Sequence, residues 1–264
     1  MPLTIATWNI NSLRHREALV RRLLEEEGPD VLCLQETKAP VEKLPLEGFR
    51  AMGYVHTLAR GEKGYNGVAI LARVPIEEAD ARSFCGRDDT RHLAARLADG
   101  LVIHNLYVPA GGDVPDPGLN PKFRHKLDFL EELRAWFAAE RPRRAILVGD
   151  LNVAPREDDV WSHRQLLKVV SHTPVEVEAF GAMQAAGDWV DVTRRDIPDG
   201  KLYSWWSYRS PNWDAADKGR RLDHVWASAD LAGRMGGSRV LRHVRGWEGP
   251  SDHAPVLAVL GEAA

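Results

Sequence analysis

The chain has 264 residues, of which 44% are hydrophobic and 28% are charged, a balance typical of a folded globular protein. This composition excludes a disordered or collagen-like chain, and no apolar run approaches the ~20 residues that a membrane span requires. With 35 basic and 38 acidic residues, the net charge is −3, so binding to a polyanion would require positive charge gathered locally.

The first half of the chain predicts short strands separated by turn signals. Residues Leu3–Asn9 alternate between polar and apolar side chains, which is typical of a half-buried strand. Ser12 can cap a helix that ends near Glu27, where Gly28 and Pro29 supply a stop signal. Further strands, each bounded by Gly, Pro or Asp, are predicted at Asp30–Gln35, Tyr65–Arg73 and Leu101–Val108.

The second half begins with the clearest helix, which follows Asn120 and Pro121. Its apolar residues recur at helical spacing, at Phe123, Leu127, Leu130 and Phe137. Next come a strand buried on both faces and a second helix, at Ala145–Val148 and Val177–Ala186. The last predicted strands are Trp189–Val192, Leu222–Ala227 and Ala254–Leu260. We therefore predict one α/β domain over residues 1–264, with sheets covered by helices.

Polar side chains collect where several of these strands begin or end. The segments are Trp8-Asn9-Ile10-Asn11, Leu34-Gln35-Glu36-Thr37-Lys38, Val148-Gly149-Asp150-Leu151-Asn152 and Ser251-Asp252-His253. Each one alone is also typical of a turn, because Asn, Asp and Gly favour turns. Four together indicate one rim of a layered α/β fold, where ligands commonly bind.

The chemistry of this rim favours a hard cation. Carboxylate and amide oxygens without a Cys/His zinc pattern suit Mg²⁺ or Mn²⁺. Such a cation beside Asp150 and His253 fits attack of water on a phosphodiester. The sequence has no G-x-S-x-G elbow, no P-loop and no dinucleotide fingerprint, so serine-nucleophile, ATP and NAD chemistry are disfavoured. The amino terminus lacks the features of a signal peptide, which predicts a cytoplasmic protein.

Over nearly its whole length the chain resembles the exonuclease III-type apurinic/apyrimidinic endonucleases of the endonuclease/exonuclease/phosphatase superfamily. Besides the four segments above, the resemblance rests on Asn105-Leu106-Tyr107-Val108-Pro109, Tyr203-Ser204-Trp205-Trp206 and Arg221-Leu222-Asp223. The Asn, Glu, Gly-Asp-x-Asn and Ser-Asp-His signals indicate the superfamily. Leu-Gln-Glu-Thr-Lys, Tyr-x-Pro and Arg-Leu-Asp together point to its DNA-repair branch.

The resemblance implies a four-layer α/β sandwich of the deoxyribonuclease I type: two packed mixed sheets flanked by helices, with the site at one end. It implies Mg²⁺, replaceable by Mn²⁺, and these metal-ligand candidates: Asn9, Glu36, Asp150, Asn152 and Asp252. It also implies a set of catalytic residues, namely Tyr107, Asp150, Asn152, Asp223 and His253. The sequence leaves open whether Asp150 or His253 is the general base.

Within that set, Asp150 would orient or deprotonate water, and Asn152 would donate to a phosphate oxygen. Tyr107 would lie near the scissile phosphate or the leaving oxygen. His253 needs a carboxylate to orient its ring, and Asp252 should not supply it, because neighbours in a strand point to opposite faces. We therefore expect Asp223 to orient His253. Histidines without motif support are interpreted as structural: His163, His172 and His224.

In the aromatic segment near residue 205, we predict that some rings face the site and others pack in the core. Trp205 and Trp206 should point to opposite faces of their strand. The resemblance implies that Trp205 faces the extruded abasic sugar. Trp206 and Tyr208 are interpreted as core residues, because most aromatic clusters belong to the core. The chain departs from the family at Arg220, where some relatives carry an aromatic residue. Residues 161–173 also depart from the best-known bacterial members.

The predicted partner is duplex DNA with abasic sites or 3′ ends. No membrane is expected among the partners, and the protein is predicted to be a monomer. Candidates for contact with the DNA backbone lie next to the site motifs, at Arg14, Lys38, Lys122 and Lys126. Two alternatives remain at this point. One is a phosphatase of the same superfamily acting on lipid or inositol phosphates, and the other is a non-catalytic DNA-binding relative.

Overall fold

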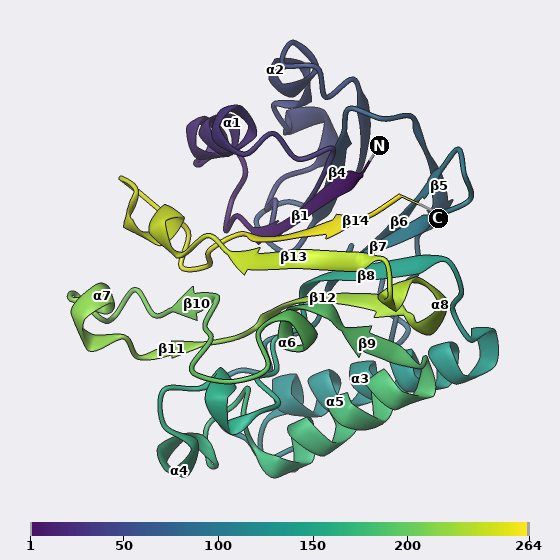
Figure 1. The fold of residues 1–264 in the computed structure, drawn as a ribbon. Coiled ribbons are helices and arrows are strands. Elements are labelled where there is room, and N and C mark those ends of the chain that lie inside the picture. The colour runs from purple at the N-terminus through teal and green to yellow at the C-terminus, as the bar shows by residue number, and fades with distance from the viewer. Residues whose placement is uncertain (1, 263–264) are drawn as a thin grey trace.

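A computed structural model describes residues 2–262, which fold into two six-stranded sheets packed face to face (Figure 1). Helices cover the outer face of each sheet, and both sheets combine parallel with antiparallel pairs. The predicted four-layer α/β sandwich is therefore confirmed.

The first sheet has the strand order β13-β14-β1-β2-β4-β3. β1 and β2 are parallel with Asn9 opposite Gln35, so both strands end at the same edge of the sheet. Helices α1 (Glu17–Glu26) and α2 (Leu46–Arg50) contribute to the buried apolar cluster on its outer face. The strands are β1 (Leu3–Asn9), β2 (Val31–Gln35), β3 (His56–Arg60), β4 (Val68–Ala72), β13 (Met235–Val240) and β14 (Val256–Leu260).

The second sheet has the order β5-β6-β7-β8-β12-β9. β7 and β8 are parallel with Tyr107 opposite Asp150, and antiparallel β12 places Asp223 opposite Asp150. Helices α3 (Pro121–Glu140) and α5 (Pro174–Ala186) cover its outer face. The strands are β5 (Ile76–Asp80), β6 (His92–Leu97), β7 (Val102–Tyr107), β8 (Ala145–Asp150), β9 (Trp189–Asp191) and β12 (Asp223–Ser228).

The main core lies between the inner faces of the two sheets. Ile5 and Cys33 of the first sheet share one buried cluster with Ile103, Val148 and Val225 of the second. β1 and β14, the first and last strands of the chain, are hydrogen-bonded neighbours (Figure 1). Segments from both ends of the sequence therefore build the same sheet.

A two-stranded ribbon stands beside the sandwich, made of β10 (Trp205–Trp206) and β11 (Gly219–Arg220) (Figure 1). Trp205 pairs with Arg220, and an isolated bridge joins Trp205 to His253 before β14. The remaining short helices are η1 (Val41–Lys43), η2 (Glu157–Asp159), α4 (His163–Leu166), α6 (Val192–Asp196), α7 (Trp213–Ala216), α8 (Ala229–Ala232) and η3 (Arg242–Gly246).

The first helix begins later than predicted, at Glu17 and not after Ser12. The backbone of Ser12 has a φ of 89°, which does not fit a right-handed helix, and its N–H donates to the carbonyl of Glu36 at 2.7 Å. This segment therefore wraps around the end of β2. The start of α3 is as predicted, because the side chain of Asn120 accepts a hydrogen bond from the backbone of Lys122.

The sequence did not predict β3, β5, β6 and β13. Three of these, β3, β5 and β13, are edge strands, which need no continuous apolar pattern. β13 also has an irregular register between Gly236 and Arg239. Within residues 2–262, no helix is long and apolar enough to cross a membrane.

Candidate active site

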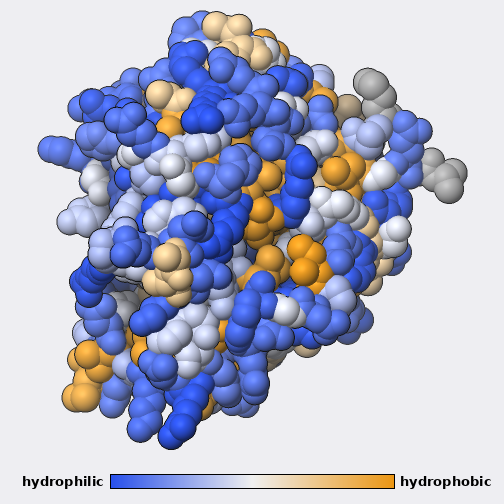
Figure 2. Space-filling model, turned by 60° about the vertical axis from the view of Figure 1, so that its left-hand side comes forward, coloured by the Kyte–Doolittle hydropathy of each residue, from blue (hydrophilic) through white to orange (hydrophobic). Residues whose placement is uncertain are grey.

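A pocket of about 820 Å³ lies where the polar strand ends meet. One group of lining residues is polar or ionisable: Glu36, Tyr107, Asp150, Asn152, Asp252 and His253. A second group includes Trp161, Val170, Trp205, Lys218, Arg220 and Leu222. The surface seen in Figure 2 is mostly hydrophilic, with hydrophobic side chains in small patches. Three of the four predicted polar segments thus line this pocket, and the fourth reaches them through the hydrogen bonds of Asn9 to Glu36 and Asp150.

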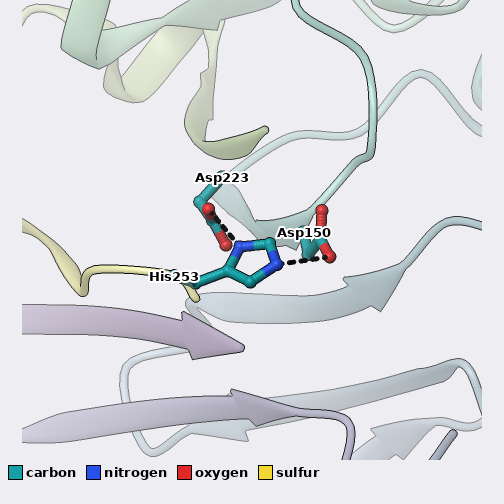
Figure 3. A group of neighbouring side chains, drawn as sticks. All are labelled: Asp150, Asp223 and His253. Carbon is teal, nitrogen blue, oxygen red and sulfur yellow. Dashed lines mark hydrogen bonds and ion pairs between the residues drawn. The ribbon is translucent and has the colours of Figure 1, made fainter. Parts of the chain in front are cut away.

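His253 lies between two carboxylates from neighbouring strands, as Figure 3 shows. Its Nδ1 is 2.8 Å from Asp223 Oδ2, and its Nε2 is 3.7 Å from Asp150 Oδ2. All three side chains are buried. The carboxylate that contacts Nδ1 is thus Asp223 and not Asp252, as the alternation argument predicted.

Asp223 is itself held by Ser204, whose role the sequence analysis did not identify although it lies in a quoted motif. The Ser204 hydroxyl donates to Asp223 Oδ2 at 2.6 Å and accepts from the backbone N–H groups of Leu222 and Asp223, each at 3.0 Å. Ser204 therefore fixes the carboxylate that orients His253.

The electrostatics of this group favour a positively charged imidazole ring. Burial by itself disfavours the charged ring, but the carboxylates of Asp223 and Asp150 outweigh burial and raise the pKa of His253 to about 10. Burial, with the nearby carboxylates of Asp223 and Glu36, raises the pKa of Asp150 to about 7. A cation near Asp150 would oppose that rise.

Glu36 is positioned by three neighbours. Its Oε1 accepts hydrogen bonds from Asn9 Nδ2 at 2.9 Å and from the Tyr107 hydroxyl at 2.8 Å. Its Oε2 lies 2.6 Å from the ammonium group of Lys38. Burial favours the neutral acid, but Lys38 and these hydrogen bonds lower the pKa of Glu36 below its ordinary value. Lys38 thus neutralises Glu36 beside the pocket, a contact that the sequence analysis did not predict.

Asn9 connects the two halves of the acidic cluster. Its Nδ2 donates to Glu36 Oε1 and also to Asp150 Oδ2 at 2.8 Å, while its Oδ1 accepts from the backbone N–H of Asn11 at 3.1 Å. One amide group therefore separates two carboxylates from different sheets. In this arrangement the amide nitrogen of Asn9 faces the carboxylates, and its role as a metal ligand stays a prediction.

Asp252 is connected to the same cluster through Asn11, whose backbone N–H donates to Asn9. Its Oδ2 accepts from the indole N–H of Trp205 at 2.9 Å, and its Oδ1 accepts from Asn11 Nδ2 at 3.1 Å. Asn152 lines the pocket, where its Nδ2 donates to the carbonyl of Val108 at 2.9 Å. Both side chains are therefore held in place by contacts within the chain.

The structure contradicts the predicted role of Lys126 in binding DNA. Its side chain is fully buried, and its Nζ lies 2.5 Å from Glu176 Oε2 and 2.7 Å from the carbonyl of Asn152. A buried, paired ammonium cannot reach a DNA backbone, so Lys126 supports the loop that carries Asn152. Of the other three candidates, Arg14 and Lys122 are exposed, whereas Lys38 is half-buried and paired with Glu36.

The aromatic segment divides mostly as predicted. Trp206 is 1% exposed and packs with Tyr203 and Ala254, whereas Trp205 lines the pocket. Tyr208, expected in the core, is instead 48% exposed. The Tyr208 ring lies on the surface because the guanidinium of Arg245 stacks over it and its hydroxyl donates to the Pro250 carbonyl.

The donor chemistry of the pocket fits a hard divalent cation. Asp150, Asp223 and His253 place one donor atom each within 4.8 Å of one another, but the hydrogen bond between Asp223 and His253 already uses two of these atoms. The oxygens of Glu36 and Asp150, which share the amide of Asn9, are the better match for Mg²⁺.

The chain is similar to known proteins over nearly its whole length. A family model described as the endonuclease/exonuclease/phosphatase family matches residues 6–253. The chain belongs to this family. The exodeoxyribonuclease III of Haemophilus influenzae is 29% identical, with 96% of this chain and 97% of the relative covered. The DNA repair nuclease APEX1 of Danio rerio is also 29% identical, with 98% of this chain and 82% of the relative covered.

Solved structures of family members have the same fold. An AP endonuclease from Archaeoglobus fulgidus has a TM-score of 0.91 and 34% identity, with 98% of this chain and 99% of that chain covered. The 3′ phosphatase NExo from Neisseria, bound to a product DNA hairpin, has a TM-score of 0.91 and 31% identity, with 98% and 100% covered. The predicted resemblance to exonuclease III-type AP endonucleases is thereby confirmed.

Proposed function

We propose that this chain is a Mg²⁺-dependent DNA repair phosphodiesterase, in which Mn²⁺ can substitute. It cleaves duplex DNA on the 5′ side of abasic sites and removes nucleotides or blocking groups from 3′ ends. The observation that carries the proposal is the buried His253 between Asp223 and Asp150, with Asp150 joined to the carboxylate of Glu36 through the amide of Asn9. Full-length similarity to exonuclease III and to AP endonucleases supports DNA as the substrate.

Glu36, Asp150 and Asp252 would hold the divalent cation, with Asn9 and Asn152 as further oxygen donors. When bound, such an ion would neutralise charge on the phosphate and lower the pKa of water. Lys38 helps to lower the pKa of Glu36, so this carboxylate is ionised, which is the form that binds a cation.

In this proposal Asp150 accepts the proton of the attacking water. Both nitrogens of His253 face carboxylates, so the ring is set up to donate and not to accept a proton. Protonated His253 would donate to a phosphate oxygen and stabilise the negative charge that develops there. Asp150 would orient the attacking water and accept its proton, while Asn152 and Tyr107 would contact the phosphate from the neighbouring strand end.

The proposal also covers contacts with DNA and the organisation of the chain. Arg14 and Lys122 are exposed cations that would contact the DNA backbone, and Trp205 would face an extruded abasic sugar. We infer that residues 1–264 act as one domain, because β1 and β14 share a sheet. A monomeric state and a cytoplasmic location stay predictions.

Three duplexes test the function directly: one with a single tetrahydrofuran abasic analogue, one with a blunt end and one with a 3′-phosphate. The proposal predicts nicking on the 5′ side of the analogue and trimming of the other two, all abolished by EDTA and restored by Mg²⁺. A chain that binds these duplexes but cleaves none of them with Mg²⁺ or Mn²⁺ would be a non-catalytic relative, and the proposal would be wrong.

A further inference from the structure

Two histidines outside the catalytic group contact one another at the two ends of one pocket wall. His163 begins α4 (Figure 1) and His172 lies just before α5, and Nδ1 of the first ring is 2.9 Å from Nε2 of the second. Between them run residues 164–171, of which Val170 and Ser171 line the pocket. The pair of rings therefore joins both ends of the segment that forms this wall.

The surroundings of His172 determine which of its ring nitrogens carries the proton. Its Nδ1 lies 2.6 Å from the carbonyl oxygen of Ala154, which can only accept a hydrogen bond, so Nδ1 is the protonated nitrogen. Burial lowers the pKa of His172 below its ordinary value, which favours the neutral ring. The Nε2 of this neutral ring therefore carries a lone pair, and that lone pair faces His163.

His163 can direct a second lone pair toward the same point. Its Nε2 is 3.5 Å from the carboxylate oxygen Oε1 of Glu157. With its proton on Nε2, the ring donates toward Glu157 and its Nδ1 lone pair faces His172. With the proton on Nδ1 instead, the ring donates to His172. The neutral ring of His163 has both tautomers, and the first of them turns the pair into two nitrogen ligands.

Both rings have the outer contacts that are typical of metal-bound histidine. A histidine that ligates a metal ion usually donates its other N–H to a carboxylate or to a backbone carbonyl. Glu157 is placed to accept from His163, and the Ala154 carbonyl accepts from His172. Each ring is thus oriented from behind, with its remaining nitrogen directed at the other ring.

The separation of the two nitrogens is close to that of two imidazoles on one ion. Two nitrogens bound tetrahedrally to Zn²⁺ lie about 3.3 Å apart, because each Zn–N bond is about 2.0–2.1 Å long. The observed separation is 2.9 Å, so the rings need to move apart by only about 0.4 Å. The His163 side chain is 39% exposed and can make this shift, whereas His172 is buried.

We propose that His163 and His172 form a binding site for a divalent transition-metal ion such as Zn²⁺, separate from the carboxylate cluster. Imidazole nitrogen suits Zn²⁺, Cu²⁺ and Ni²⁺, whereas Mg²⁺ prefers oxygen ligands. The two ring nitrogens are the protein ligands, and water completes the coordination. When the ion binds, the proton of His163 moves from Nδ1 to Nε2. The bound ion fastens the two ends of residues 164–171 to each other.

Calorimetric titration with Zn²⁺, in an excess of Mg²⁺ that occupies the carboxylate cluster, tests this site. We expect the wild type to bind one more Zn²⁺ per chain than His163→Gln, which keeps a polar side chain but lacks the imidazole. Zn²⁺ should also raise the melting temperature of the wild type more than that of His163→Gln, because an ion bound to the folded chain stabilises it. His243→Gln removes an exposed histidine on η3 and, as the matched control, should behave like the wild type.

Glu157→Gln tests the outer contact without removing a ligand. Loss of the carboxylate opposite Nε2 of His163 should weaken Zn²⁺ binding by about tenfold, the lower end of the usual range for such contacts. The Glu157 side chain is 76% exposed, so this substitution should leave the fold intact. If His163→Gln does not fold, as judged from its melting curve, the affinity of Glu157→Gln relative to the wild type decides.

A wild type that binds no more Zn²⁺ than His163→Gln would overturn the inference, and the two rings would then form only a structural hydrogen bond. The inference also fails if Glu157→Gln binds Zn²⁺ as tightly as the wild type. Neither titration measures cleavage of DNA, so the result is independent of the proposed function.

Discussion

His253 owes its properties to two carboxylates that come from different parts of the chain. Asp223 at the start of β12 orients its Nδ1, and Asp150 at the end of β8 faces its Nε2. The two strands are paired, so the backbone fixes the separation of the carboxylates. The ring then bridges them and connects the second sheet to the segment before β14. A change at Asp223 should therefore act through His253.

A double-mutant cycle tests this coupling. We expect the double variant Asp223→Asn/His253→Asn to cleave an abasic duplex hardly more slowly than His253→Asn alone, because Asp223 acts by orienting and charging the ring. Single-turnover rates of the four proteins supply the comparison. Losses that add in the logarithm of the rate would show that the two residues act independently.

Two lysines four positions apart on α3 allow a matched contrast. Lys126→Met should destabilise the fold by about 3–5 kcal/mol, because it leaves Glu176 buried without its partner. Lys122→Met should leave the melting temperature unchanged and reduce the salt dependence of DNA affinity by about one counterion. Urea unfolding and salt-dependent DNA titrations measure the two effects. A stable Lys126→Met protein with a reduced salt slope would restore Lys126 to the DNA interface.

The sequence predicted the partner of His253 but not the burial of Lys126, and the difference has a physical reason. Alternation along an expected strand argued against Asp252, and the matching motif offered Asp223. In the structure Asp252 and His253 lie before β14, and Asp252 contacts Asn11 and Trp205 instead of the ring. Burial of Lys126 depends on Glu176, which lies 50 positions away on α5. Nothing within α3 reveals that a second helix brings a carboxylate to it.

At the scale of elements, the β10–β11 ribbon separates recognition from packing. Trp205 faces the pocket and Trp206 the core, because adjacent residues in a strand point to opposite sides. Trp205 also donates to Asp252 through its indole N–H, so the ribbon is tied to the acidic cluster.

Alanine substitutions on the two sides of this strand should behave in opposite ways. Trp205→Ala should slow nicking of an abasic duplex by roughly tenfold and weaken discrimination against normal nucleotides, since aromatic stacking contributes ~1–3 kcal/mol per base. Trp206→Ala should lower stability by ~3–5 kcal/mol. Rates on abasic and intact duplexes are compared with melting temperatures. If both variants only have lower melting temperatures and keep their discrimination between duplexes, the whole strand belongs to the core.

Elements buried on both sides were predicted more completely than those at the edges. The apolar run of β8 and the capped start of α3 carry strong local signals. The edge strand β5 includes two glutamates and an aspartate and therefore resembles a loop. The shape of the pocket wall that contains Arg220 depends on pairing between β10 and β11. Strands of two residues are too short to give a recognisable sequence pattern, so this pairing was not predicted.

At the scale of the molecule, one buried carboxylate joins segments that are far apart in sequence. Asp159 of η2 accepts hydrogen bonds from the guanidinium groups of Arg194 in α6 and Arg221 just before β12. Burial favours the neutral acid, but the two guanidinium groups outweigh it and lower the pKa of Asp159 to about 2, from an ordinary 3.8. The folded state therefore stabilises the ionised carboxylate of Asp159 relative to the unfolded state.

The sign of the resulting pH dependence follows directly. The contribution of Asp159 to stability is complete above its unfolded pKa and is lost as the pH falls toward about 2. We expect Asp159→Asn to be less stable than the wild type by about 3–5 kcal/mol near neutral pH, with a difference that shrinks in acid. Urea unfolding at several pH values measures this. An unchanged difference at every pH would exclude titration of Asp159.

The proposed function requires that the carboxylate cluster hold a divalent cation without being needed for DNA binding. Glu36 is the most informative member, because it lines the pocket and its carboxylate is held by the side chains of Asn9, Lys38 and Tyr107. Glu36→Gln keeps the shape of the side chain and removes its charge. Glu47→Gln, an exposed carboxylate on α2, is the matched control.

Cleavage of the abasic duplex by Glu36→Gln, measured across a Mg²⁺ titration beside its DNA affinity, is the most direct test. We predict that cleavage falls by orders of magnitude and recovers only in part at high Mg²⁺, while DNA affinity is largely kept, because binding depends on phosphate contacts. Glu47→Gln should behave like the wild type. Full activity of Glu36→Gln at ordinary Mg²⁺ would contradict the assignment of this cluster as the catalytic metal site.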